Sequence, residues 1–249
     1  MIVYAQNYPQ LMNQAQAAGF SKPQLIELRS AFALAQRMSR NLYRAEGCPL
    51  LNHLIRMASI ALDQTRDLQL VIVGLLHAAY VLQDFDGSTY SSNVNIRRQE
   101  LKKLLGEATE QMLWDYEALP WYTRKNIENH ISSIAQKNAD EKKILYLHLL
   151  NELEDHMDYA MEYTSLSRRT RRDNENFRLC VQLARALEHT RLADEMQLLL
   201  DNPRSMHEYL CWDHPQGYEL HERIWQRSWL EAGVHVLRRL KRKLVNGAG

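Results

Sequence analysis

The scarcity of helix-breaking residues is the feature that most constrains the fold. Only 9 Gly and 6 Pro occur in 249 residues, and apolar residues recur three and four positions apart over long windows. This spacing places apolar side chains on one face of an α-helix, whereas a half-buried strand alternates them at every second position. No β-hairpin signal interrupts the pattern. We therefore predict an all-α chain of about ten helices.

Local signals set several of the expected helix ends. Ser21 is a candidate N-cap for a long helical segment that reaches residue 43, and Asp67 is a candidate N-cap for the apolar helix after it. Gly106 is placed to end a charged helix at 96–105. The segment 88–93, which reads STYSSN, consists of turn formers and predicts a loop.

Charge and cysteine content exclude several classes of protein. Lys and Arg number 31 against 30 Asp and Glu, so the formal net charge of +1 provides no general attraction to nucleic acid or anionic lipid. The chain lacks an apolar run of about 18 residues, and its first ten residues do not form a signal peptide. Cys48, Cys180 and Cys211 are unclustered, which favours free thiols over disulfides or a thiolate zinc site. We expect a cytoplasmic protein that binds neither nucleic acid nor membrane.

An arginine-rich run at 168–173 divides the chain into two parts. The first part, 1–165, is expected to be a helical domain, and the second, 166–249, a helical extension packed on it. The second part carries Trp212, Trp225 and Trp229. We interpret the arginine run and the basic tail at 238–243 as solvated helix faces.

Two histidines follow motifs of distinctive spacing. Residues 44–53 have the form R-x-x-G-x-P-x-x-x-H, and the sequence GLLH ends at His77, 24 residues after His53. A third segment, 144–155, reads ILYLHLLNELED. In this order the segments resemble the HD-domain superfamily, and most closely the RelA/SpoT-like hydrolase domains. The resemblance implies an HD-domain-like helical bundle with the C-terminal helices as an additional layer.

The carboxylates that hold a divalent metal in that family are replaced here. Ala78 follows His77 where the family has the aspartate of its His-Asp pair, and the last aspartate ligand falls on Asn151. The acidic pair of the hydrolases falls on Val81 and Leu82. Hard divalent cations bind mainly through oxygen anions, and without a bound metal no water is acidified. The resemblance therefore disfavours the usual metal-dependent phosphohydrolase mechanism.

The remaining polar residues still define a pocket. Tyr80 lies one helical turn past His77, and Asp155 one turn past Asn151. The pattern is similar to uncharacterised superfamily members that carry H-x-x-Y in place of the His-Asp pair. We take four residues as catalytic candidates and two as substrate-binding candidates, namely His53, His77, Tyr80 and Asp155 in the first group and Arg44 and Asn151 in the second.

Each candidate also has a structural interpretation. The two histidines either perform acid–base chemistry, or bind zinc or iron with Asp155 as third ligand, or are hydrogen-bonded core residues. No other cofactor is implied. Tyr80 could be an aromatic residue with a satisfied hydroxyl, and Arg44 could form a salt bridge at a helix end instead of holding a phosphate or carboxylate.

Several nearby polar residues are assigned to the surface. Glu154 and Asp158 are interpreted as surface charge, and Glu152 with His156 as a surface ion pair one turn apart. The segment 207–214, which reads HEYLCWDH, has no metalloprotease spacing and is interpreted as a packed aromatic layer.

Three functions remain open from the sequence. The first, which we favour, is a divergent HD-fold enzyme that acts on a small molecule through His53 and His77. The second is a pseudo-hydrolase that binds a nucleotide or another phosphorylated ligand through Arg44 without cleaving it. The third is an interaction scaffold built on the C-terminal half. The expected partner is a small-molecule ligand, and a homodimer is an open alternative for the assembly.

Overall fold

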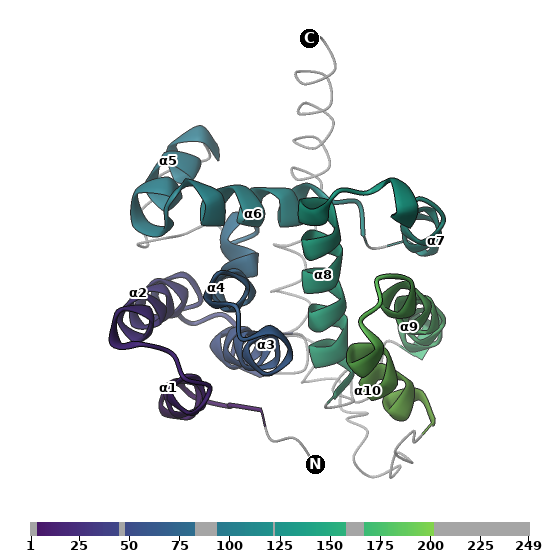
Figure 1. Cartoon of the computed structure of the whole chain (residues 1–249), viewed down its shortest axis with the longest axis horizontal. Helices are drawn as coiled ribbons and strands as arrows, with labels where there is room; N and C mark the ends of the chain where they lie inside the picture. Colours follow the sequence, from purple (N-terminus) through teal and green to yellow (C-terminus); the bar gives the residue numbers. More distant parts are fainter. Residues whose placement is uncertain (1–3, 45–47, 83–93, 122, 158–166, 202–249) are drawn as a thin grey trace.

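The computed structural model describes five stretches of the chain, and within them the fold is all-α, as predicted. Ten α-helices and two short 3-10 segments occur there, and no β-strand (Figure 1). The described stretches are 4–44, 48–82, 94–121, 123–157 and 167–201. The expected loop at 88–93, the tryptophans of the C-terminal half and the segments 207–214 and 238–243 lie outside them.

The helices lie in the five described stretches. In chain order they are α1 (Tyr8–Ala17), α2 (Lys22–Met38), α3 (Leu50–Thr65), α4 (Leu68–Leu76), the 3-10 segment η1 (His77–Tyr80), α5 (Val94–Leu105), α6 (Glu107–Ala118), α7 (Arg124–Ser132), the 3-10 segment η2 (Ile134–Gln136), α8 (Ala139–Met157), α9 (Ser167–Ala186) and α10 (Thr190–Asp201). None of the described helices combines the length and the apolar character that a bilayer crossing requires.

Helices α3 and α4 form the centre of the bundle. They pack along each other, with α1 and α2 on one side and α8 on the other (Figure 1). Every residue of α3 from His53 to Leu62 is buried, and so is every residue of α4 from Leu70 to Leu76. At Gly74 the two helices pack closely, since a Cβ atom there would lie 3.4 Å from both the side chain and the backbone oxygen of Met57, which is van der Waals contact.

The expected helix caps are present. The carboxylate of Asp67 accepts a hydrogen bond from the backbone N–H of Gln69 (2.8 Å) at the start of α4. Gly106, with a φ of 82°, follows the last residue of α5, and its N–H donates to Lys102. Ser21 is the N-cap residue of α2, as expected. The helix ends at Met38, however, and not at residue 43. The left-handed φ of 58° at Asn41 is incompatible with a continued helix.

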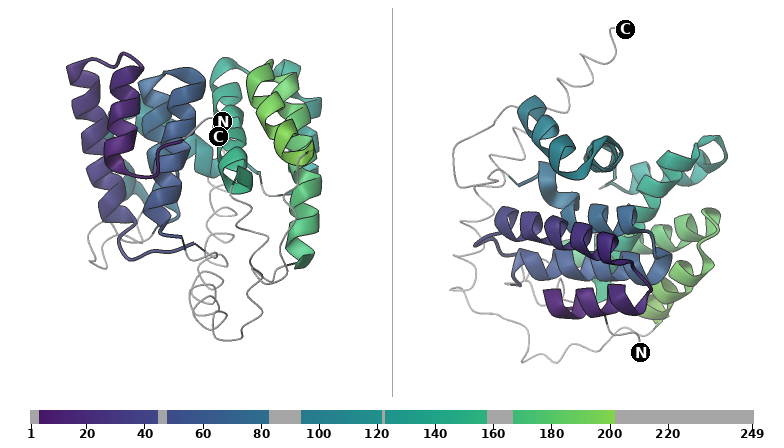
Figure 2. Two further views of the ribbon diagram at one scale, coloured as in Figure 1. Left: turned by 90° about the horizontal axis from the view of Figure 1, so that it is seen from below. Right: turned by 60° about the vertical axis from the view of Figure 1, so that its left-hand side comes forward.

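Helices α9 and α10 pack against each other and against α7 and α8, on the opposite side of α8 from α3 (Figures 1 and 2). Phe177 on α9 and Leu192 on α10 contribute fully buried side chains to the core. The arginine-rich run at 168–173 lies in the first part of α9, which begins just after the expected boundary at 165/166. Arginine is a good helix former, which accords with the position of the run in a helix. The division of the chain into two parts stays a prediction.

Candidate functional site

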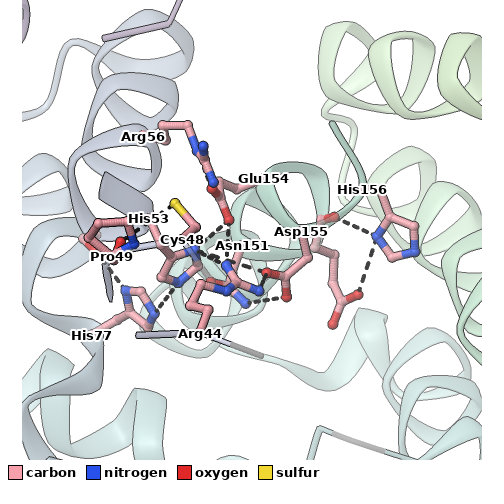
Figure 3. A network of polar contacts seen from close by, with 12 residues as sticks. Arg44, Cys48, Pro49, His53, Arg56, His77, Asn151, Glu154, Asp155 and His156 are labelled. Atoms are coloured by element: carbon pink, nitrogen blue, oxygen red, sulfur yellow. Dashed lines mark hydrogen bonds and ion pairs between the residues drawn. The ribbon is translucent and has the colours of Figure 1, made fainter. Parts of the chain in front are cut away.

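The two histidines and the C-terminal part of α8 meet beside a short loop (Figure 3). His53 lies in the first turn of α3, and His77 is the first residue of η1. Arg44 precedes α3, and its backbone is fixed because its N–H donates to the carbonyl of Cys48 (2.9 Å). An isolated antiparallel bridge between Tyr43 and Pro49 closes the same loop. These contacts fix the backbone at Arg44, whose side chain reaches Nδ1 of His53.

His77 has one defined tautomer in its neutral form. Its Nδ1 atom lies 2.7 Å from the carbonyl oxygen of Gly74, and a carbonyl oxygen only accepts hydrogen bonds. The Nδ1 atom must therefore carry the hydrogen, which leaves a lone pair on Nε2. This Nε2 atom lies 3.2 Å from the Nε2 atom of His53, and the rings meet edge to face with centroids 5.0 Å apart. His53 is therefore the donor in this contact, through its Nε2–H.

The remaining nitrogen of His53 contacts two charged groups. When His53 is neutral, its Nδ1 atom accepts a hydrogen bond from Nη1 of Arg44. The second hydrogen of Nη1 is donated to Oε2 of Glu154 at 2.9 Å, and this oxygen also lies against Nδ1 of His53. If His53 were protonated, Nδ1 would instead donate to Glu154. Arg44 and Glu154 thus stabilise opposite protonation states of the same ring nitrogen.

Two guanidinium groups neutralise the two carboxylates of this site. Besides its bond to Glu154, Arg44 donates through Nη2 to Oδ1 of Asp155 at 2.5 Å. Arg56, on the buried face of α3, donates through Nε to the other oxygen of Glu154, also at 2.5 Å. The Glu154 side chain is only 1% exposed, so this pairing is needed to keep its charge inside the protein.

Burial keeps both histidines uncharged at neutral pH. Desolvation, together with the positive charge of Arg44, lowers the pKa of His53 to about 3. Desolvation and the proximity of His53 lower the pKa of His77 to about 4. At pH 7 the pair therefore consists of two neutral imidazoles joined by one hydrogen bond.

Asn151 and Asp155 lie at this site, as expected. The amide nitrogen of Asn151 is 3.3 Å from Oδ2 of Asp155, one helical turn further along α8. The amide oxygen of Asn151 is buried and has no hydrogen-bond partner among the described residues. An unsatisfied buried acceptor is unfavourable, so this oxygen is a point where a ligand could bind.

Tyr80 does not join the histidines. Its hydroxyl donates to the fully buried carboxylate of Glu110 on α6, which also accepts two hydrogen bonds from Arg98 at 2.6 and 3.0 Å. The Tyr80 ring meets Trp114 edge to face with centroids 5.4 Å apart. A buried carboxylate needs several donors, and Tyr80 supplies one of them. The structure therefore places Tyr80 in a separate polar cluster, where its hydroxyl is satisfied.

The assignment of Glu154 to the surface is wrong. Glu154 is four residues after Leu150 and seven after Leu147, so it lies on the apolar stripe of α8. That spacing is the signal in the sequence that places Glu154 inside the protein. The signal for Arg56 is its position within the mostly apolar stretch 54–62 of α3, where a charged side chain needs a buried partner.

Glu152 and His156 are also less exposed than a surface ion pair. The Glu152 carboxylate accepts a hydrogen bond from Nε1 of Trp121 at 2.7 Å and is 4.0 Å from His156. The His156 ring donates to the Glu152 carbonyl and stacks on Phe177 of α9, with centroids 3.8 Å apart. This pair therefore serves the packing between α8 and α9.

The donor atoms do not fit the metal set expected from the sequence. Ligand atoms of His53, Glu154 and Asp155 lie within 4.8 Å of one another, but on the Nδ1 edge of His53. His77 faces the other edge, at Nε2, and the lone pairs of an imidazole diverge. A single ion on His53 therefore cannot also take both His77 and Asp155. Nor does a hard divalent cation fit, because Arg44 and Arg56 already neutralise the carboxylates.

One family of known proteins matches part of the chain that contains this site. A family model described as a domain of unknown function, DUF6817, matches residues 33–121. The matched stretch contains both histidines, Arg44 and Arg56, whereas the carboxylates of α8 lie beyond it. The chain is thus similar to a family of uncharacterised domains over the helices that carry the histidine pair. No curated protein matches the chain.

Proposed function

We propose that the chain is a divergent HD-fold enzyme that transfers protons to and from a small molecule at His53 and His77, without a divalent metal. The hydrogen bond between the two Nε2 atoms carries this proposal. In this contact His53 carries an N–H donor on Nε2 and His77 carries a lone pair on Nε2. Both rings are neutral, and their contacts fix the two tautomers. Such a pair can donate to one substrate atom and accept from another.

The arrangement of the elements supports the HD-like relationship. The resemblance implies three features in chain order. They are a histidine one turn into the helix after a G-x-P turn, a second histidine at the end of the next helix, and a later helix with polar residues at its end. His53 on α3, His77 after α4 and Asp155 on α8 follow that order and lie together.

The tautomers indicate how each histidine would act. His53 is neutral at pH 7 and carries its hydrogen on Nε2, so it is suited to donate a hydrogen bond to a carbonyl oxygen that gains negative charge. His77 has its lone pair on Nε2 and would accept the proton from the same substrate, for which its pKa of about 4 makes it a weak base. The substrate would insert between the two Nε2 atoms and take over their mutual hydrogen bond.

The charge balance favours an uncharged substrate over a nucleotide. Arg44 and Arg56 carry two positive charges, and Glu154 and Asp155 carry two negative charges, so these four residues contribute no net charge. Arg44 directs three of its N–H bonds to protein groups. A phosphorylated ligand would have to displace Asp155, which is why binding of a nucleotide without turnover is the weaker alternative. The near-neutral composition and the buried free thiol of Cys180 accord with a cytoplasmic setting.

Untargeted mass spectrometry tests this proposal. The purified chain is incubated with a cell extract of small metabolites, in parallel with His53→Asn and His77→Asn. Asparagine removes Nε2. It can place its amide nitrogen near Nδ1 of His77, which donates to Gly74, and its amide oxygen near Nδ1 of His53, which accepts from Arg44, so the anchoring contacts are retained. Tyr80→Phe, in the separate cluster, is the matched control.

A compound that is consumed by the natural chain and by Tyr80→Phe, but not by either asparagine variant, supports the proposal. No change in any compound, or equal consumption by His77→Asn, contradicts it. Consumption that requires added manganese or magnesium would contradict the metal-independent mechanism.

A further inference from the structure

We propose that the guanidinium of Arg44 occupies the position of a metal ion, so that His53, Glu154 and Asp155 form a latent metal site that the chain closes with its own cation. This inference goes beyond the proposed function and stands whether or not the histidine pair is catalytic.

The first support is the geometry of the three donors. One ring nitrogen and two carboxylate oxygens lie within 4.8 Å of one another, which is the ligand set of a small metal site with three protein ligands. Arg44 contacts each of the three: Nη1 contacts Nδ1 of His53 and donates to Glu154 at 2.9 Å, and Nη2 donates to Asp155 at 2.5 Å. The cation is therefore at the centre of the donor set (Figure 3).

The second support is the difference between the two arginines. Arg56 bonds the opposite oxygen of Glu154, Oε1, and contacts Gln6 with its Nη1 atom. It neutralises charge without lying among the three donors. Without Arg44, Arg56 would be the one remaining cation paired with these two carboxylates among the described residues, and the excess of negative charge would attract a cation.

The third support is a further oxygen donor beside the cluster. The side-chain oxygen of Asn151 is buried and has no hydrogen-bond partner among the described residues, although its amide nitrogen donates to Asp155. A guanidinium has only N–H donors on fixed directions, whereas a metal ion can accept an additional neutral oxygen ligand. The Asn151 oxygen is thus an unsatisfied neutral acceptor on a residue that contacts Asp155, one of the three donors.

Metal-binding measurements on arginine variants test the inference. Arg44→Ala and Arg44→Ser remove the guanidinium that lies among the three donors. Arg56→Met is the matched control. It also removes one positive charge that pairs with Glu154, but it leaves Arg44 among the donors. Each protein is stripped with chelator and titrated with zinc chloride and with manganese chloride. Bound metal is measured by calorimetry and by elemental analysis.

Arg44→Ala and Arg44→Ser should each bind about one zinc ion per chain. Their affinity should exceed that of the natural chain and of Arg56→Met by at least about 100-fold, because in these two variants the ion no longer has to displace the Arg44 guanidinium from the three donors. The further substitution His53→Ala in the Arg44→Ala chain should abolish this binding.

Two results would overturn the inference. One is zinc binding by the natural chain as tight as that of Arg44→Ala. The other is the absence of metal binding by both Arg44 variants while circular dichroism shows them folded. If the variants unfold in chelator, recovery of helicity on addition of zinc supports the latent site, and no recovery in either variant counts against it. Turnover is not measured in this experiment, so its failure is separate from failure of the proposed enzyme function.

Discussion

The Nε2 atoms of His53 and His77 lie 3.2 Å apart, although 24 residues separate the two histidines in the sequence. The carbonyl of Gly74 fixes the hydrogen of His77 on Nδ1, and the contact between the rings then requires His53 to donate. The shape of the bundle, with α3 packed along α4, brings the two rings together. The properties of the site follow from this one contact and from the ion pairs around it.

The stability of the fold should fall in mild acid. The folded-state pKa values of His53 and His77, about 3 and about 4, are below the ordinary value of 6.5, so the unfolded chain binds more protons in this range. The stabilisation that comes from burying the two histidines in their neutral form is complete above pH 6.5. It is lost as the pH falls from 6.5 toward the folded-state pKa values. Each histidine should lower the free energy of unfolding by about 1.4 kcal/mol per pH unit within this window.

Urea unfolding at pH 7.5, 6.5, 5.5 and 4.5 measures this loss. His53→Asn should show a shallower dependence on pH than the natural chain, since one of the two groups no longer titrates. Equal slopes for the two proteins would mean that His53 is not held neutral by its surroundings.

Glu154→Gln should destabilise the protein strongly. The substitution keeps the size of the side chain. It removes the carboxylate that accepts hydrogen bonds from both Arg56 and Arg44. Loss of one partner from a buried ion pair typically costs about 3–5 kcal/mol. Asp140→Asn, which changes an 86% exposed carboxylate on the same helix, is the control and should leave the free energy of unfolding nearly unchanged. A small effect of Glu154→Gln in urea unfolding would show that Glu154 is hydrated and not paired.

Tyr80→Phe should affect stability without affecting the histidines. The hydroxyl that is lost donates to the buried Glu110, and a hydrogen bond to a charged group contributes about 1.5–3 kcal/mol. Thermal unfolding should therefore shift to a lower temperature. The nitrogen and proton resonances of His53 and His77 should stay where they are in the natural chain. Altered histidine resonances would show that Tyr80 is coupled to the histidine site.

The helical fold could be predicted because it depends on short-range signals. The scarcity of Gly and Pro, the Asp67 N-cap and the glycine at the end of α5 are signals that act within a few residues. The structure confirms the Asp67 cap and the positive φ of Gly106. The end of α2 could not be placed, because the left-handed turn at Asn41 leaves little trace in an apolar pattern.

The candidate site was only partly predictable because its charges are compensated across the fold. The convergence of His53, His77 and Asp155 was expected from a resemblance, and the structure brings their elements together. Glu154 pairs with Arg56, 98 residues away in the sequence, as well as with Arg44, and such pairing has no local pattern. Tyr80 satisfied the helical spacing from His77, but Glu110 of a later helix takes its hydroxyl.

Nitrogen NMR of the chain with ¹⁵N-labelled histidine, recorded from pH 8 to pH 5, tests the neutral histidine pair most directly. The expected spectrum shows His77 protonated on Nδ1 only and His53 protonated on Nε2 only, with neither ring titrating in this range. Substitution of each histidine in turn by asparagine assigns the signals. A His77 ring protonated on Nε2, or a pair that takes up a proton near pH 6.5, would contradict the neutral pair on which the proposed chemistry depends.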